Sequence, residues 1–338
     1  INNAAPIDLS IGNEQYLYGT NEWAPIVDTR GDVMDIKDVI TLFKHPSVKA
    51  TAGGRKLDYI ASRKIRMPVN KENAIASGII DRKYEDQIPD SIVLVIPDGK
   101  EHLTKPELFM LDLLSNYQWD RPLHVLSRGG DINIGIKDYL SFEGYSYKFV
   151  PVRSVQTEDD LGFVDTEKLY TKMTEKYSWD ALAADNYFID YQNMFTHLGV
   201  MSMRNMFYTA ATAFDKEGQT QRAVEMLDKC QEILDPQRYP LETVPAGLFS
   251  NDYSVISMID AYFKLGEKEK GRTLAVAMRD ELIKSVTFFR NHYDIAAPEF
   301  EYSAKYLYIL GDVLQQAGEK ELADGCTKVV TSLLGVEE

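Results

Sequence analysis

The first half of the chain is organised around a strongly apolar helix that a short strand follows directly. From 108 to 114 every residue except Asp112 is apolar, so the predicted helix has no wide solvent face and belongs in a core. Thr104 and Glu107 have the spacing of a capping box, which predicts that the helix begins directly after Thr104. The segment 122–127 is predicted to be a strand, because the proline at its start disfavours further helix.

The residues before this helix predict an α/β unit. The uninterrupted β-branched run at 92–96 is typical of a strand buried on both faces. Strand, helix and strand in this order predict a right-handed βαβ crossover at the centre of the unit. An amphipathic helix is predicted over 35–43, where apolar residues recur at helical intervals. Further strands are predicted at 65–69, 75–80 and 145–152.

Two glycine pairs invite comparison with phosphate-binding loops. The segments 52–55 and 128–131 each contain two adjacent glycines. Neither segment completes a nucleotide-binding fingerprint, and no clear strand precedes the first. Both are therefore predicted to be turns.

Every periodic signal beyond the polar, acidic segment 153–162 is helical, beginning with a predicted helix over 165–177. Gly218, Gly266 and Gly318 each follow a bulky apolar residue by four positions and precede a small residue by five. This pattern resembles the two antiparallel helices of a tetratricopeptide repeat, in which glycine ends the first helix and small residues allow close packing. The glycines are further apart than the usual ~34 residues, so longer helices or insertions must take up the excess.

These patterns predict an α+β protein of two domains, since 338 residues exceed what one ordinary core serves. Residues 1–155 are predicted to form an α/β domain with a small mixed sheet. Residues 163–338 are predicted to form an all-α, tetratricopeptide-like helical-repeat domain with about three helix pairs.

Composition narrows the class of partner. The net charge of −15 opposes general adhesion to nucleic acid, so no nucleic-acid partner is expected. No apolar run approaches the ~20 residues of a membrane span, and the first residues lack the features of a secretion signal, so we expect a water-soluble piece of a longer protein. Cys230 and Cys326 have neither metal-ligand nor disulfide spacing and are predicted to be buried.

The titratable side chains form no pattern that names a reaction. The histidines are scattered without a ligand pair, and no nucleophile elbow occurs, so we predict no catalytic residue, no metal site and no cofactor. His124 is more simply explained as a core or rim residue than as a base. The 20 tyrosines and 3 tryptophans could supply stacking platforms for a sugar, but most are expected to serve packing.

Four segments taken together resemble a known family. MLDLLSNYQWDRPLHVLS, IGIKDYLSFEGYSYKFVPV, VDTEKLYTKMTEKYSW and RNMFYTAATAFDKEGQTQRAVEMLDKC look like the soluble C-terminal region of a bacterial family of large multispanning membrane proteins. The membrane domain of that family is similar to protein O-mannosyltransferases. The resemblance implies a membrane-bound glycosyltransferase of the lipid-linked-sugar type. Its catalytic loops and its membrane spans would lie outside this chain, and this part would face the periplasm.

Three hypotheses of function follow. The first is a non-catalytic accessory region that docks a protein, a peptide or a glycan for a membrane glycosyltransferase. The second is a hydrolase or transferase site in the α/β half, beyond the ends of strands 92–96 and 123–127 and assembled from distant residues. The third is a structural spacer or oligomerisation element.

For the first hypothesis, the binding groove is predicted on the first helix of each repeat, with one set of three residues on each. Alternatively, the repeats serve only to pack against the α/β half. The predicted groove residues are Asn205, Tyr208, Thr212, Tyr253, Ile256, Asp260, Lys305, Tyr308 and Asp312.

Overall fold

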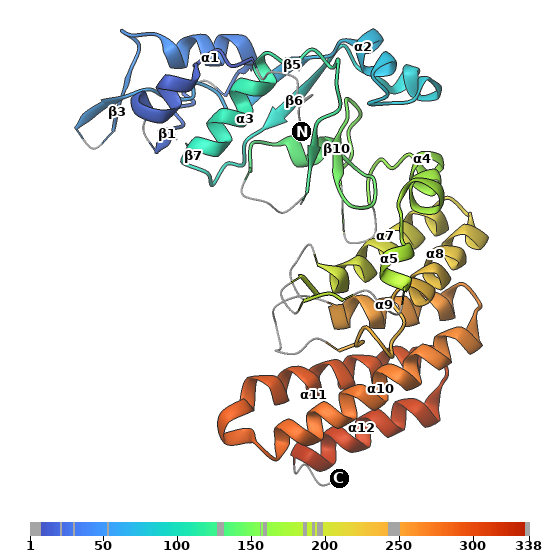
Figure 1. The fold of residues 1–338 in the computed structure, drawn as a ribbon. Coiled ribbons are helices and arrows are strands. Elements are labelled where there is room, and N and C mark those ends of the chain that lie inside the picture. Colours follow the sequence, from blue (N-terminus) through green and yellow to red (C-terminus); the bar gives the residue numbers. More distant parts are fainter. Residues whose placement is uncertain are drawn as a thin grey trace. The chain divides into compact units, whose positions relative to one another are not determined.

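The computed structural model of the chain describes residues 8–20, 22–29, 31–52, 54–126, 132–155, 157, 161–184, 188–190, 193–194, 199–242 and 251–334. The chain divides into two compact units, Ile1–Asp165 (unit 1) and Thr166–Glu338 (unit 2). Unit 1 combines short strands with helices, and unit 2 is helical, so the predicted α+β fold is confirmed (Figure 1).

Unit 1 is built from short elements around one apolar core. They are η1 (Gln15–Gly19), β1 (Trp23–Pro25), β2 (Val33–Asp35), α1 (Ile36–Lys44), β3 (Ala50–Ala52), β4 (Arg55–Leu57), β5 (Lys64–Pro68), α2 (Lys71–Ala76), η2 (Arg82–Gln87), β6 (Ser91–Val95), β7 (His102–Thr104), α3 (Lys105–Ser115), β8 (His124–Val125), η3 (Ile136–Tyr139), β9 (Leu140–Phe142) and β10 (Tyr147–Phe149).

The sheet β2-β5-β6 is mixed, as predicted, but its crossover differs from the expected one. β2 pairs parallel with β5, α1 lies between them in the chain, and β6 pairs antiparallel with β5. β8 belongs to another sheet, β8-β10-β9. The predicted βαβ crossover from 92–96 through α3 is therefore wrong, and the parallel unit is β2-α1-β5. β6 is an edge strand in which Val95 is 49% exposed, so it is not buried on both faces.

The helix α3 begins where the capping box predicts. The Glu107 carboxylate accepts from the Thr104 backbone N–H at 2.9 Å and from its hydroxyl at 3.0 Å. Leu108, Leu111 and Leu114 are almost fully buried. The predicted helix over 35–43 is also confirmed, as α1.

Three predicted strands need correction or shortening. Residues 75–80 are not a strand, because Asn70 caps α2 by accepting from the Asn73 backbone N–H at 3.0 Å and the chain leaves α2 in a turn. The strands expected at 122–127 and 145–152 reduce to β8 and β10, the first with Ser127 outside the described residues. Ala52 pairs with Arg55 where β3 and β4 meet, as the turn predicted at 52–55 requires, while Gly53 and 128–131 lie outside the described residues.

Unit 2 consists of helices that stack side by side (Figure 1). They are α4 (Thr166–Thr171), η4 (Lys172–Lys176), α5 (Asp180–Ala183), η5 (Val200–Ser202), α7 (Met203–Lys216), α8 (Thr220–Ile233), α9 (Asn251–Lys264), α10 (Lys268–Arg290), α11 (Tyr293–Gln316) and α12 (Lys320–Leu334).

The helices from α7 onward form pairs, and each pair turns at a predicted glycine. Gly218, Gly266 and Gly318 have φ of +72°, +85° and +84°, which a glycine adopts without strain. A Cβ added to Gly271 or to Gly311 would lie 3.3 Å from atoms of the neighbouring helix, so these positions bring paired helices close together. The excess spacing between repeats is taken up partly by the lengths of α10 and α11, 23 and 24 residues.

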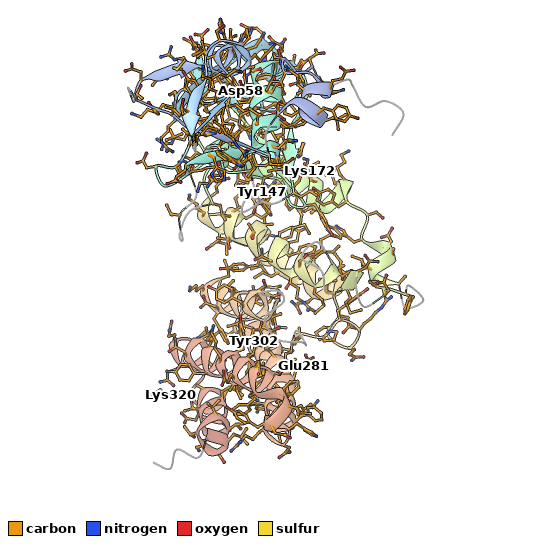
Figure 2. All side chains as sticks on the ribbon, turned by 90° about the vertical axis from the view of Figure 1, so that its left-hand side faces the viewer. Asp58, Tyr147, Lys172, Glu281, Tyr302 and Lys320 are labelled. Carbon is orange, nitrogen blue, oxygen red and sulfur yellow. The ribbon has the colours of Figure 1, made fainter. Side chains whose placement is uncertain are left out.

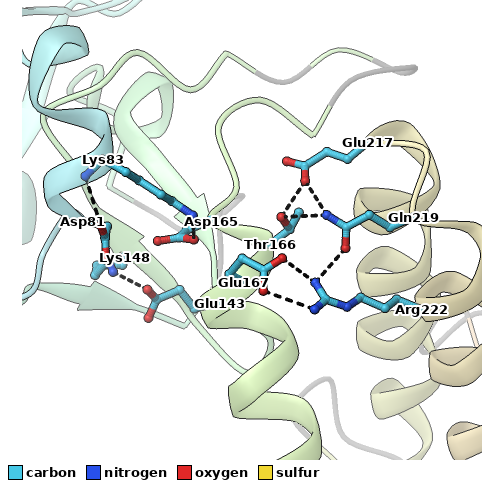
Figure 3. Close-up of polar contacts among 10 residues, drawn as sticks. All are labelled: Asp81, Lys83, Glu143, Lys148, Asp165, Thr166, Glu167, Glu217, Gln219 and Arg222. Atoms are coloured by element: carbon cyan, nitrogen blue, oxygen red, sulfur yellow. Dashed lines mark hydrogen bonds and ion pairs between the residues drawn. The ribbon is translucent and has the colours of Figure 1, made fainter.

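The first helix of unit 2 is fixed to α8 and to the α7–α8 turn by polar contacts (Figure 3). Arg222 donates to Glu167 at 2.5 and 3.2 Å. The Thr166 hydroxyl donates to Glu217 at 2.6 Å, and Gln219 donates to the same carboxylate at 2.8 Å. Deeper in the unit both cysteines are buried and free, as predicted.

Candidate functional site

The predicted groove residues lie on three helices that contact one another in the order α7, α9, α11. On α7, Asn205 is exposed and Tyr208 and Thr212 are half-buried. On α9, Tyr253 is 55% exposed and Asp260 is half-buried. On α11, three residues are exposed, among them Tyr308 at 62%. We give the name tyrosine face to the eight of these residues that are exposed or half-buried, together with the exposed Lys264 of α9: Asn205, Tyr208, Thr212, Tyr253, Asp260, Lys264, Lys305, Tyr308 and Asp312.

Ile256 is the exception among the predicted residues. Its side chain is only 2% exposed, so it lies in the core and cannot line a groove. α9 contacts α7 on one side, α11 on the other and its partner α10 behind, which leaves only a narrow stripe for solvent. Ile256 falls outside that stripe, although Tyr253, one turn earlier, falls within it.

Lys264 brings the α7 and α9 parts of the tyrosine face together. Its ammonium group lies 2.6 Å from the Asp260 carboxylate, one turn earlier on α9. The hydrogen bond to Asp260 raises the pKa of Lys264, and weaker electrostatic contributions from Tyr208 and Tyr253 act in the same direction. The charge of Lys264 is therefore paired within α9 and is influenced by a tyrosine of α7 and one of α9.

The α11 part of the face is joined to α9 through a buried carboxylate. The Tyr302 and Tyr306 rings are in tilted contact with their centroids 4.6 Å apart, and Tyr302 hydrogen-bonds with Asp252 of α9. Burial, followed by the charge of Asp252, raises the pKa of Tyr302 (labelled in Figure 2). Lys305 lies with its ammonium 5.9 Å from the Tyr306 ring centroid, so basic and aromatic groups alternate along this helix.

A buried arginine fixes the first helix of the face. Arg204 is fully buried and directly precedes Asn205. Its guanidinium donates to the backbone carbonyls of Pro240 and Tyr239, both at 2.7 Å, and of Leu234 at 3.2 Å. Burial lowers the pKa of Arg204, and the three carbonyls supply the acceptors that a desolvated cation needs. The segment after α8 is thereby tied to α7.

A second polar cluster ties the same segment to α10 and α11. Ser303 donates to Glu242 at 2.5 Å, and Ser285 donates to its other carboxylate oxygen. Glu281 in turn accepts from the backbone N–H groups of Leu241 and Glu242, at 2.8 and 3.1 Å. Burial raises the pKa of Glu242, while the serine hydrogen bonds oppose the shift and the charge of Glu281 adds to it.

The buried carboxylates of α3 in unit 1 serve the fold. Asp112 is fully buried and accepts from the backbone N–H groups of Ser10 and Ile11, both at 2.9 Å, and from the Tyr16 hydroxyl at 3.2 Å. Burial, followed by the Asp112 charge, raises the pKa of Tyr16. The carboxylate thus holds the N-terminal segment against α3.

Glu107 likewise binds backbone N–H groups of neighbouring segments as a buried carboxylate. Burial alone would raise its pKa, but hydrogen bonds from the backbone amides of Thr104 and Asn133, the second at 2.7 Å, outweigh burial. The Lys100 ammonium at 3.0 Å acts in the same direction, so the pKa is lowered. This carboxylate is satisfied as an anion, unlike a general acid with a raised pKa.

The enzymatic hypothesis expected a pocket beyond the ends of two neighbouring strands of one sheet. β6 and β8 lie in different sheets, so that switch point does not form. Unit 1 does have a cavity of about 320 Å³ elsewhere, next to α2 and the end of α3. It is lined by Lys37, Pro68, Val69, Asn70, Glu72, Leu114, Ser115, Tyr117, Gln118 and Trp119, a set without converging carboxylates or histidine.

Within the part of the chain that the structure describes, no group of three or more His, Cys, Asp or Glu side chains is arranged to hold a metal ion. Within the same residues, no helix has the length and apolar character needed to cross a membrane.

The tyrosine face combines exposed tyrosine rings with one ion pair. Tyrosine offers a flat apolar ring with a polar tip, a combination suited to polypeptide and sugar surfaces alike. Lys264 and Tyr302 belong to this region, and sequence reasoning missed both. The spacing of Asp260 and Lys264, four residues apart on a predicted helix, would have found Lys264, whereas nothing in the sequence pairs Tyr302 with Asp252.

Comparison with known proteins adds one family. Residues 1–168 match the family model described as TMEM260-associated domain 2. No curated protein and no solved structure matches the chain. The first half of the chain is therefore similar to a domain associated with a TMEM260-type membrane protein. The bacterial source, the mannosyltransferase similarity and the tetratricopeptide assignment stay predictions.

Proposed function

We propose that the chain is the accessory region of a membrane-bound glycosyltransferase similar to protein O-mannosyltransferases, and that its tyrosine face binds a polypeptide segment of a partner. The observation that carries the proposal is the exposure of Tyr253 and Tyr308, 55% and 62%, on the neighbouring helices α9 and α11. Exposed tyrosines clustered on adjacent helices are typical of binding surfaces.

The polar groups beside these tyrosines favour a polypeptide. Backbone N–H and C=O groups of an extended segment can pair with Asn205 and Thr212 and with the tyrosine hydroxyls. Charged side chains of such a segment would meet both signs, since Asp260 and Lys264 lie beside each other. A glycan would use the same ring faces but offers no charge for this ion pair, and it is the alternative outcome of the test.

The cellular setting belongs to the same proposal. In it, the region lies at the periplasmic face of the inner membrane and is joined to the membrane through spans that precede this chain in the parent protein. The match to a TMEM260-associated domain supports the membrane setting. An alkaline-phosphatase fusion to the C-terminus of the parent protein tests the side, because that enzyme is active only after export.

The binding experiment is a selection of random peptides displayed on phage against the purified chain. Selected peptides are then measured by fluorescence anisotropy against Tyr253→Ala/Tyr308→Ala and against the control Tyr18→Ala. Tyr18 is 87% exposed in unit 1, so its loss removes an equally accessible ring. We expect the double variant to weaken binding at least about tenfold and the control to leave it unchanged. Peptides that bind both variants equally, or glycans captured on an array in their place, would contradict the proposal.

A second function is favoured by the end of the α10–α11 hairpin. Phe288, Tyr293 and Ile295 are exposed there, Ile295 by 80%. Such a protruding apolar end fits the oligomerisation hypothesis through contact with a second copy. Sedimentation velocity tests it, with a concentration-dependent dimer in the unaltered chain and a monomer in Phe288→Ser/Ile295→Ser as the expected result. A monomer at every concentration of the unaltered chain would remove it.

A further inference from the structure

A surface groove separates α8 from the N-terminal half of α10, away from the residues of the tyrosine face. Two open cavities, of about 500 and 560 Å³, meet at Asp228. The first reaches Gln231 and Pro236 on one side and Thr273 and Ala277 on the other. The second continues along α8 toward Thr220, Gln221 and Val224, the last of these facing Leu265.

The second helices of the pairs, α8, α10 and α12, do not pack equally closely against one another. α10 packs against α12, whereas α8 and α10 are bridged by the ion pair of Asp228 and Lys270, at 2.8 Å. Below that bridge the Tyr262 hydroxyl donates to Asp228 at 3.0 Å. The groove is therefore a gap in the outer layer whose floor is buried, since Tyr262 is only 1% exposed.

The lining combines an apolar interior with an acidic rim. Val224, Leu265, Leu274 and Ala277 contribute apolar surface. Glu225, Asp228, Glu267 and Glu269 supply four carboxylates to the edges. Lys270 is the basic residue of this lining, and it is already engaged by Asp228 and by Glu267 at 3.3 Å. The rim thus carries excess negative charge around an apolar trough.

We propose that this groove binds a basic amphipathic helix of a partner polypeptide. An apolar trough between two helices is the shape that a helix fills with its own apolar stripe. The acidic rim selects Lys or Arg on the flanks of that stripe and repels an acidic helix. From Thr220 to Gln231 the groove follows α8 for about 17 Å, which accommodates about three turns of an added helix.

This proposal is independent of the proposed function, because the two surfaces share no residue. Binding in the groove would place the added helix beside α8 and α10 in the outer layer of the stack. The tyrosine face on α7, α9 and α11 would stay accessible, so the chain could hold two partner segments at once. A negative binding result for one surface therefore leaves the proposal for the other surface unaffected.

The test uses three fluorescein-labelled peptides of about 14 residues, made from Leu with Lys or Glu. The amphipathic Lys peptide has Leu at helical spacing and Lys at the other positions. The Glu peptide has the same Leu pattern with Glu in place of Lys. The scramble has the composition of the Lys peptide in an order that forms no apolar stripe on a helix. The scramble controls for general attraction of cations to a chain of net charge −15. Binding to the full chain is measured by fluorescence anisotropy at 150 mM salt.

Two kinds of variant locate the site. Gln231→Trp and Thr273→Trp each fill the groove, with Gln315→Trp, at an exposed position of α11, as control. Glu267→Lys/Glu269→Lys reverses the rim, with Glu301→Lys/Glu321→Lys as the control of equal charge at exposed positions. Circular dichroism verifies that each variant keeps its helices, and a filling variant that unfolds leaves the other to decide.

We expect the amphipathic Lys peptide to bind at least about tenfold more tightly than the scramble and the Glu peptide. The groove variants should lose that advantage, the two controls should retain it, and Tyr253→Ala/Tyr308→Ala should have no effect. Equal binding of peptide and scramble, or full binding to the filled and charge-reversed variants, would overturn the proposal.

Discussion

Lys264 and Asp260, one turn apart on α9, form an ion pair of 2.6 Å. An exposed pair four residues apart on a helix contributes little to stability, about 0.3–0.5 kcal/mol. Lys264 is 72% exposed, so the small value applies. The pair therefore contributes little to holding the fold.

This relationship predicts that Lys264→Met lowers the free energy of unfolding by no more than about 0.5 kcal/mol, because only a solvated ion pair is lost. The same variant should weaken peptides selected on the tyrosine face, since their acidic groups lose a partner. Urea unfolding and fluorescence anisotropy measure the two effects. A large loss of stability, with binding unchanged, would assign Lys264 to the scaffold.

Replacement of the three turn glycines and of Gly325, inside α12, should change stability in opposite directions. Gly218→Ala, Gly266→Ala and Gly318→Ala have open space for the new methyl group, so their cost of about 1 kcal/mol comes from φ alone. Gly325→Ala, inside α12, also meets open space but has helical φ and should stabilise by about 0.5–1 kcal/mol. Thermal unfolding of the four variants checks this, and a common sign for all four would contradict the turn geometry.

Asp112→Asn should destabilise unit 1 by about 2–3 kcal/mol. The carboxylate accepts two backbone N–H groups with separate oxygens, and an amide would turn its NH₂ group toward one of them. Hydrogen exchange of the α3 amides reports the loss. Asp98→Asn, at an exposed position, is the matched control and should change the exchange by less than about 0.5 kcal/mol.

The raised pKa of Glu242 predicts that the stability of unit 2 depends on pH. Burial raises its folded pKa above the unfolded value of 4.5, so the folded state binds the proton more tightly. This contribution is complete below the unfolded pKa and is lost as pH rises through the folded pKa. The melting temperature of Glu242→Gln, relative to that of the unaltered chain, should therefore increase as pH rises from 4.5 toward neutral. A constant difference between the two chains would exclude the effect.

The sequence predicts correctly those elements whose ends are set by interactions between residues close together in the chain. The capping box at Thr104 and Glu107 and the turn glycines each act over a few residues, and the structure has them where they were predicted. The segment 75–80 was misassigned because its isoleucines favour a strand, while the side-chain cap from Asn70 decides for α2.

Non-local partners could not be predicted in the same way. The sequence of 92–96 predicts a strand but not that its neighbour is β5, about 30 residues earlier, in antiparallel orientation. Ile256 was placed on the face by helical spacing, but the width of the exposed stripe depends on how closely α7 and α11 pack against α9. The contact of Tyr302 with Asp252 likewise exists only once α11 lies against α9.

The central claim, that the tyrosine face holds a partner polypeptide, is tested most directly by photo-crosslinking. The photoreactive residue p-benzoylphenylalanine replaces Tyr253, Tyr308 or, as control, Tyr18, and a peptide selected on the unaltered chain is added before irradiation. The account predicts covalent capture from positions 253 and 308 and none from 18. Capture from 18 alone, or from none of the three while the peptide still binds, would contradict it.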